Sequence, residues 1–101
     1  MKIKIKFSKI SHSDAIKEYA EEKINMLDKY LGEMKALNCD VEVSKEAKHQ
    51  SGNVFRAEIN LELPGTLLRV EKTAEDMYKA IDKAKDHLVR SIIDYKEKRR
   101  N

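Results

Sequence analysis

The spacing of the apolar residues constrains this chain most, because it changes from every second residue to every third or fourth and back again. Residues 1–7, MKIKIKF, alternate lysine with apolar side chains, which is typical of a strand with one buried face. Residues 13–31 then follow helical spacing, with Ser13 as the expected N-cap and Gly32 as the expected stop. The apolar stripe expected on this helix is Ile16, Ala20, Ile24, Leu27 and Leu31.

Two-residue spacing returns in residues 39–45, 54–63 and 66–72, which predicts three more strands. Pro64-Gly65 separates the last two. The side chains expected to face inward are Cys39, Val41, Val43, Phe55, Ala57, Ile59, Leu61, Leu63, Leu68 and Val70. A final helix is expected to begin at Thr73 as N-cap, with Asp76 in a near capping-box position. Its expected buried stripe is Met77, Ile81, Ala84, Leu88, Ile92 and Tyr95.

The order β-α-β-β-β-α predicts an α+β fold: a two-layer sandwich of a four-stranded sheet with two helices on one face. The first strand is expected to run parallel to its partner, and the others to form a meander. The last five elements have the order of a double-stranded-RNA-binding domain, although the acidic helix start TAEDMYKA and the loop AKHQSGN lack the docking residues usual there.

We expect one domain over residues 1–95 and a basic C-terminal tail over 96–101.

Composition excludes several classes of function. The chain has 101 residues and a net charge of +3, and its positive excess lies at the two ends. Cys39 is the single cysteine and suits a reducing cytoplasm, and no apolar run approaches the length of a membrane span. His12, His49 and His87 have no partners at metal-ligand spacing, and no glycine-rich loop or nucleophile motif occurs. We therefore expect no enzyme, no cofactor, no small-molecule substrate and no membrane contact.

Two surfaces carry rows of lysine or arginine. Lys2, Lys4 and Lys6 of the first strand are expected to lie opposite Asp40 and Glu42, which favours cross-strand pairs over phosphate binding. On the last helix, cations project opposite the buried stripe, with acids in the same arc; the cations are Lys79, Lys83 and Arg90, with His87 at the edge. Such a row suits a nucleic-acid backbone, but helical spacing alone leaves a merely solvated face equally open.

The chain resembles a known family along nearly its whole length. The resemblance rests on SDAIKEYAEEKINMLDKY, on VFRAEINLEL, and above all on AEDMYKAID followed by LVRSI. These strings are similar to those of the ribosome hibernation promoting factors, also known as ribosome-associated inhibitor, protein Y or sigma-54 modulation proteins. The resemblance implies a non-catalytic cytoplasmic protein that binds the small ribosomal subunit and ribosomal RNA in the mRNA/tRNA channel and inhibits translation. Either a short-form factor or the first domain of a long-form member would fit.

The resemblance also implies an RNA-binding set. Basic family positions fall on Lys23, Lys29, His87 and Arg90, and Tyr78 belongs to the family string, where contact with RNA and packing against the first helix are equally open. With the cations of the last helix and its basic end, the expected rRNA-binding residues are Lys23, Lys29, Tyr78, Lys79, Lys83, His87, Arg90, Lys98 and Arg99. Positions commonly basic in relatives are Met26, Ile93 and Asp94 here, and Val89 with Ile93 suggests a protein contact or weak self-association. A general RNA-binding module and a protein–protein adaptor are the alternative functions.

Overall fold

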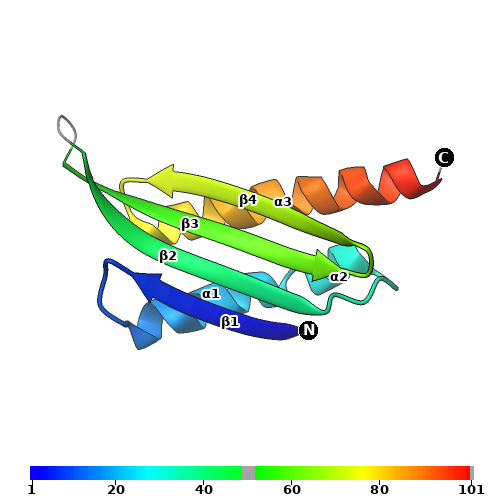
Figure 1. Cartoon of the computed structure of the whole chain (residues 1–101), viewed down its shortest axis with the longest axis horizontal. Coiled ribbons are helices and arrows are strands. Elements are labelled where there is room, and N and C mark those ends of the chain that lie inside the picture. Colours follow the sequence, from blue (N-terminus) through cyan, green and yellow to red (C-terminus); the bar gives the residue numbers. More distant parts are fainter. Residues whose placement is uncertain (49–51, 101) are drawn as a thin grey trace.

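A computed structural model of the protein describes residues 1–48 and 52–100 (Figure 1). Residues 49–51, which include His49, and residue 101 lie outside the described part. The elements are β1 Lys2–Ser8, α1 Asp14–Asn25, α2 Asp28–Leu31, β2 Asn38–Lys48, β3 Gly52–Leu63, β4 Thr66–Ala74 and α3 Met77–Arg100. The strands form one layer, and the helices lie together on one face of it (Figure 1). The predicted two-layer α+β fold is confirmed.

The strand order in the sheet is β1-β2-β3-β4. β1 pairs with β2 in parallel, and β2 pairs with β3 and β3 with β4 antiparallel. This is the predicted topology, in which the helical crossover after β1 returns the chain in the same direction and the other strands form a meander. β1 and β4 are consequently the two edge strands of the sheet.

The core lies between the sheet and the helices. Alternate residues of β2 and β3 are buried, as their two-residue spacing predicted, and Ile59 and Leu61 are 0% exposed. From the helix side, Leu27, Ile81 and Leu88 are also at most 1% exposed. The predicted stripe residues Ile16 and Tyr95 are partly buried and pack against this cluster. The apolar spacing therefore identified the layer interface correctly.

The first helical segment differs from the prediction because it is two helices rather than one. Ser13 caps it as expected, its Oγ accepting a 3.3 Å hydrogen bond from the backbone N–H of Ile16. After Asn25 the chain tightens, and the N–H of Leu27 bonds to the carbonyl of Ile24, three residues back, at 3.0 Å. This tighter turn keeps Leu27 in the core while it ends α1. Gly32 then stops α2 with a φ of 61°.

The predicted N-cap of the last helix is wrong. Thr73 lies in β4, where it is paired with Arg56 of β3, so its backbone is extended rather than poised to start a helix. Asp76 takes the capping role, its Oδ1 accepting hydrogen bonds from the N–H of Tyr78 at 2.7 Å and of Lys79 at 3.3 Å. At its other end α3 continues to Arg100, so the basic residues from position 96 onward form its last turns, which extend past the sheet (Figure 1).

Candidate nucleic-acid interface

A groove runs between the edge strand β4 and helix α3. Its volume is about 700 Å³, and its lining comes from three consecutive strand residues and from one face of the helix. The lining residues are Glu71, Lys72, Thr73, Lys83, Asp86, His87 and Arg90. Three members of the predicted RNA-binding set, Lys83, His87 and Arg90, are therefore brought together on one concave surface.

The carboxylates of the groove are already paired with other cations. Asp86 lies 3.5 Å from Lys85 Nζ on α3 itself. Within residues 1–48 and 52–100, no carboxylate lies within 4.0 Å of the charged groups of Lys72, Lys83 or Arg90. The groove thus presents three cations without an ion-pair partner in the described part of the chain, and it suits an anion.

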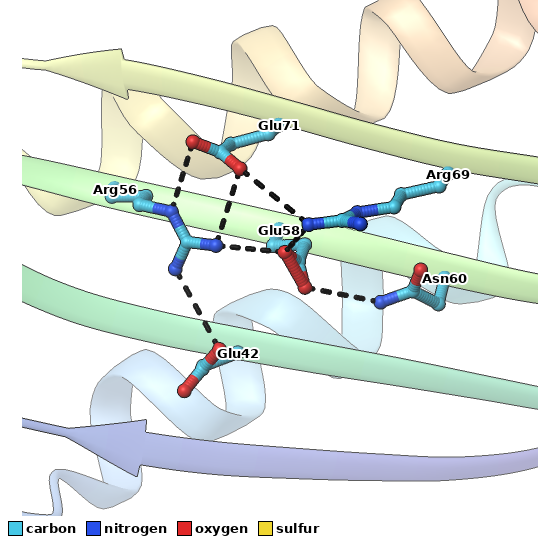
Figure 2. Close-up of polar contacts among 6 residues, drawn as sticks. All are labelled: Glu42, Arg56, Glu58, Asn60, Arg69 and Glu71. Carbon is cyan, nitrogen blue, oxygen red and sulfur yellow. Dashed lines mark hydrogen bonds and ion pairs between the residues drawn. The ribbon is translucent and has the colours of Figure 1, made fainter.

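Glu71, the other acid of the groove, is held by an ion-pair network on the open face of the sheet, as Figure 2 shows. Arg56 Nε lies 3.0 Å from Glu71, and Arg56 Nη2 donates to Glu58 at 2.7 Å. Arg56 also lies 3.6 Å from Glu42, and Arg69 donates to Glu58 at 2.8 Å. The hydrogen bond from Arg56 lowers the pKa of Glu71, and the same bond raises the pKa of Arg56. The negative charge of Glu71 is therefore offset by this network.

Lys72 is the groove residue that the sequence-based set missed. It follows Leu68 and Val70 at two-residue spacing, which places it on the helix-facing side of β4, and it is half-buried there. The expected strand over residues 66–72 already contained this signal. The predicted set comes instead from the faces of the helices and the basic end of the chain, and so it does not include this strand position.

Lys79 lies one turn before the groove residues and has its own partner. Its Nζ lies 3.0 Å from Glu75, and the hydrogen bond from Lys79 to that carboxylate raises the pKa of the lysine. The pair is exposed and four residues apart, so it stabilises the helix start only slightly. Lys79 was expected in one row with Lys83 and Arg90, but it is absent from the groove lining.

Lys23 and Tyr78 belong to the contact between α1 and α3. The hydroxyl of Tyr19 donates a 2.6 Å hydrogen bond to Asp82, and the rings of Tyr19 and Tyr78 meet edge to face with centroids 4.9 Å apart. Lys23 Nζ lies 3.7 Å from Asp82 and 5.2 Å from the Tyr19 ring. Both predicted site residues therefore help to join the helices, although Tyr78 remains 40% exposed.

The remaining predicted residues lie toward the other end of the helix layer. Lys29 Nζ sits 5.2 Å from the centroid of the Tyr30 ring, and Arg99 donates to the Tyr95 hydroxyl at 3.2 Å. Lys96 Nζ donates to the backbone carbonyl of Tyr30 at 3.0 Å, which ties the end of α3 to α2. Lys98 is exposed on the same last turns. This basic end is separate from the groove lining.

The lysines of β1 have the predicted register but not the predicted contacts. Lys4 is paired with Asp40 and Lys6 with Glu42 across the parallel strands. Within the described residues, however, neither lysine comes within 4.0 Å of a carboxylate, because Glu42 points to Arg56 instead (Figure 2). Register alone therefore did not establish those ion pairs.

Two large apolar side chains of the helical layer are also exposed. Met26 and Ile93 are each 40% exposed, and Val89 is partly buried against the core.

None of the helices in the described ranges combines the length and the low polarity that spanning a membrane requires. The same ranges contain no group of three or more His, Cys, Asp or Glu side chains that could hold a metal ion.

Comparison with known proteins agrees with the fold and with the strings in the sequence. The family model of sigma 54 modulation protein / S30EA ribosomal protein matches residues 3–100. The N-terminal domain of protein Y from Thermus thermophilus superposes with a TM-score of 0.79 at 35% identity, covering 94% of this chain and 99% of that domain. A ribosomal subunit interface protein from Coxiella burnetii has the same TM-score at 22% identity, which shows the shared fold.

Two curated relatives carry the name ribosome hibernation promotion factor. The protein from Lactococcus lactis subsp. cremoris is 36% identical over 100 residues, covering 95% of this chain and 50% of the relative. The one from Deinococcus radiodurans is 34% identical over 84 residues, covering 83% of this chain and 43% of the relative. The chain thus spans about half the length of the curated relatives it matches. With a family match along almost all of its residues and a shared fold, the chain belongs to the sigma 54 modulation protein / S30EA ribosomal protein family.

Proposed function

We propose that this chain is a ribosome hibernation factor that binds the small ribosomal subunit in the mRNA/tRNA channel and inhibits translation without catalysing a reaction. The observation that carries the proposal is membership of a family whose curated relatives are named ribosome hibernation promotion factor. Cations that have no ion-pair partner among the described residues gather at one groove and support an RNA partner, because phosphates bind cations whose charge is not already offset. In this proposal the protein acts by occupying the channel of the small subunit, so we expect it in the cytoplasm.

The proposed contacts are electrostatic and distributed over two regions. The β4–α3 groove supplies Lys83, His87 and Arg90, and the end of α3 supplies Lys98 and Arg99. Lys23, Lys29 and Tyr78 lie on the helix layer and complete the predicted surface, while Lys79 contributes less because Glu75 already offsets its charge. Each phosphate contact releases condensed counterions, so affinity for the subunit should fall steeply as salt rises.

Cosedimentation with small ribosomal subunits through sucrose gradients at low and high salt tests the proposal. Wild-type protein should comigrate at low salt and dissociate as salt rises, and should inhibit a cell-free translation reaction over the same salt range. Changing Lys83→Glu together with Arg90→Glu should abolish both effects. A matched control, Lys2→Glu with Lys17→Glu, makes the same change in charge at exposed residues outside the groove and should behave as wild type. Failure of the wild-type protein to comigrate at low salt would contradict the proposal.

A protein contact is the second candidate function, and the 40% exposure of Met26 and of Ile93 favours it. In that case the surface around Val89 and Ile93 would bind a protein or a second copy of the chain. Ile93→Asp would then abolish the contact without weakening RNA binding. Analytical ultracentrifugation of the wild-type protein and of Ile93→Asp over a concentration series measures self-association directly, and a wild-type protein that is monomeric at all concentrations would reject self-association.

A further inference from the structure

We propose that the β4–α3 groove is a phosphate site for single-stranded RNA in which Lys72 of the edge strand contacts the same backbone as Lys83 and Arg90 of α3. The inference deepens the proposed function, on which it rests, by naming the ligand chemistry of one surface. It adds a residue from the sheet to an interface that the sequence placed on the helices and on the end of the chain.

The position of Lys72 carries the inference. The residue is paired with Ala57 across β3 and β4, and its side chain has the same parity as Leu68 and Val70, toward the helix layer. It is half-buried and lines the groove together with Lys83 and Arg90, as expected of a lysine whose aliphatic stem is covered while its ammonium stays accessible. A strand of the sheet and a helix thus both contribute cations to one concave site with excess positive charge.

A simpler role for Lys72 is protection of the sheet edge. Inward-pointing charges on edge strands discourage pairing with another chain, and β4 is an edge strand. That role is independent of the sign of the charge, and glutamate serves it as well as lysine. It also gives no reason for Lys83, His87 and Arg90 to gather beside Lys72, when no carboxylate of the described residues lies within ion-pair distance of the lysines or of Arg90. The two roles therefore differ in what Lys72→Glu does to RNA binding.

The shape of the groove favours a single strand over a duplex. A duplex is too wide to enter a groove of about 700 Å³ between a strand edge and a helix, whereas the backbone of a single strand can bend into such a channel. Of the seven lining residues, His87 alone carries a ring on which a base could stack. We therefore expect recognition of the phosphate backbone with little preference for base sequence, which is typical of electrostatic channels for single strands.

The test compares Lys72 with Lys2, a lysine on the opposite edge strand that lies outside the groove. Affinity for a fluorescent uridine homopolymer and for a duplex of equal length is measured by polarisation over a series of salt concentrations. Lys72→Glu should weaken binding of the single strand about tenfold, and Lys72→Gln should reduce the slope of log affinity against log salt by about 0.7, the value for one phosphate contact to a single strand. Lys2→Glu and Lys2→Gln should change affinity less than twofold.

Circular dichroism and thermal melting check that each variant is folded. If Lys72→Glu does not fold, Lys72→Gln still provides the test. Unchanged affinity in the folded Lys72 variants, equal losses for Lys72 and Lys2, or tighter binding of the duplex would each overturn the inference. Cosedimentation of the wild-type protein with small subunits separates the two proposals. Loss of comigration with the Lys72 effect retained would reject the ribosomal function and leave the groove assignment standing.

Discussion

The hydroxyl of Tyr19 on α1 donates a 2.6 Å hydrogen bond to the carboxylate of Asp82 on α3, 63 residues later in the chain. This bond joins the two helices of the layer at the point where the Tyr78 ring also meets Tyr19. Tyr19→Phe should lower the free energy of unfolding by about 1 kcal/mol, because one hydrogen bond is lost while the ring contact remains. Urea denaturation measures this free energy, with Tyr30→Phe as the control. Equal losses for Tyr19→Phe and Tyr30→Phe would contradict a stabilising role of the hydrogen bond.

The same bond predicts an alkaline pH dependence. It raises the pKa of Tyr19 from 10.0 to about 12, so the folded protein holds this proton more tightly than the unfolded chain does. The stability contributed by Tyr19 is therefore fully present below pH 10 and is lost as pH rises from 10 to about 12. Ultraviolet titration of tyrosinate should show one late tyrosine in wild type that is missing in Tyr19→Phe. Four tyrosines ionising together would reject the prediction.

Arg56 should matter to stability far more than Arg69. Its side chain is 16% exposed and contacts Glu42, Glu58 and Glu71, whereas that of Arg69 is 61% exposed. Arg56→Met should cost about 2 kcal/mol, because it leaves charge-assisted hydrogen bonds unmade, and Arg69→Met about 0.5 kcal/mol. Because Arg56 lowers the pKa of Glu71 from 4.5, part of the cost of Arg56→Met should disappear as pH falls below 4.5 and Glu71 takes up its proton. Urea titrations at neutral and acidic pH test both statements.

The cap of α3 gives a direct comparison between two residues. Asp76→Ala should destabilise the protein by about 1 kcal/mol, because the N–H groups of Tyr78 and Lys79 lose their acceptor. Thr73→Ala, at the position the sequence pattern selected as cap, should change stability by less than about 0.5 kcal/mol. Thermal melting of the two variants measures the difference, and a larger loss for Thr73→Ala would restore the original assignment.

Cys39 should react with thiol reagents only when the protein unfolds. Its side chain is 0% exposed, and burial raises the pKa of its thiol from 9.0 to about 12. The reactive thiolate is therefore both inaccessible and scarce at neutral pH. The labelling rate should rise with urea in parallel with the unfolded fraction and be several hundredfold slower in its absence than for the denatured chain. Rapid labelling of folded protein would contradict the burial.

The sequence predicted the layers well because apolar spacing is a local property that survives in the fold. Ile59, Leu61 and Leu88 are in the core for the reason their spacing indicated. The cap at Thr73 was wrong because a non-local register, with Arg56 as its partner, extended β4 past the expected boundary. Strand pairing of this kind cannot be read from one segment.

In the candidate site, too, local features could be predicted from the sequence and non-local ones could not. The cations of α3 could be predicted because they share one helix, but their grouping with Lys72 depends on how β4 packs beside that helix. The pairing of Lys79 with Glu75, by contrast, was readable from their four-residue spacing. The sequence did not show that the charge of Glu71 is offset, because its ion pair with Arg56 joins two neighbouring strands, β3 and β4.

The parallel pairing of β1 with β2 has a consequence for the order in which the protein is made. Lys2 pairs with Asn38 and Ser8 with Ser44, so β1, which is synthesised before β2, lacks this partner until β2 has emerged. During this interval β1 is a free strand with apolar side chains, the kind of segment that pairs with other nascent chains. The lysines between Ile3, Ile5 and Phe7 give that waiting strand a positive charge at every second residue. The alternation that defines the fold thus also protects the nascent chain from aggregation before the fold exists.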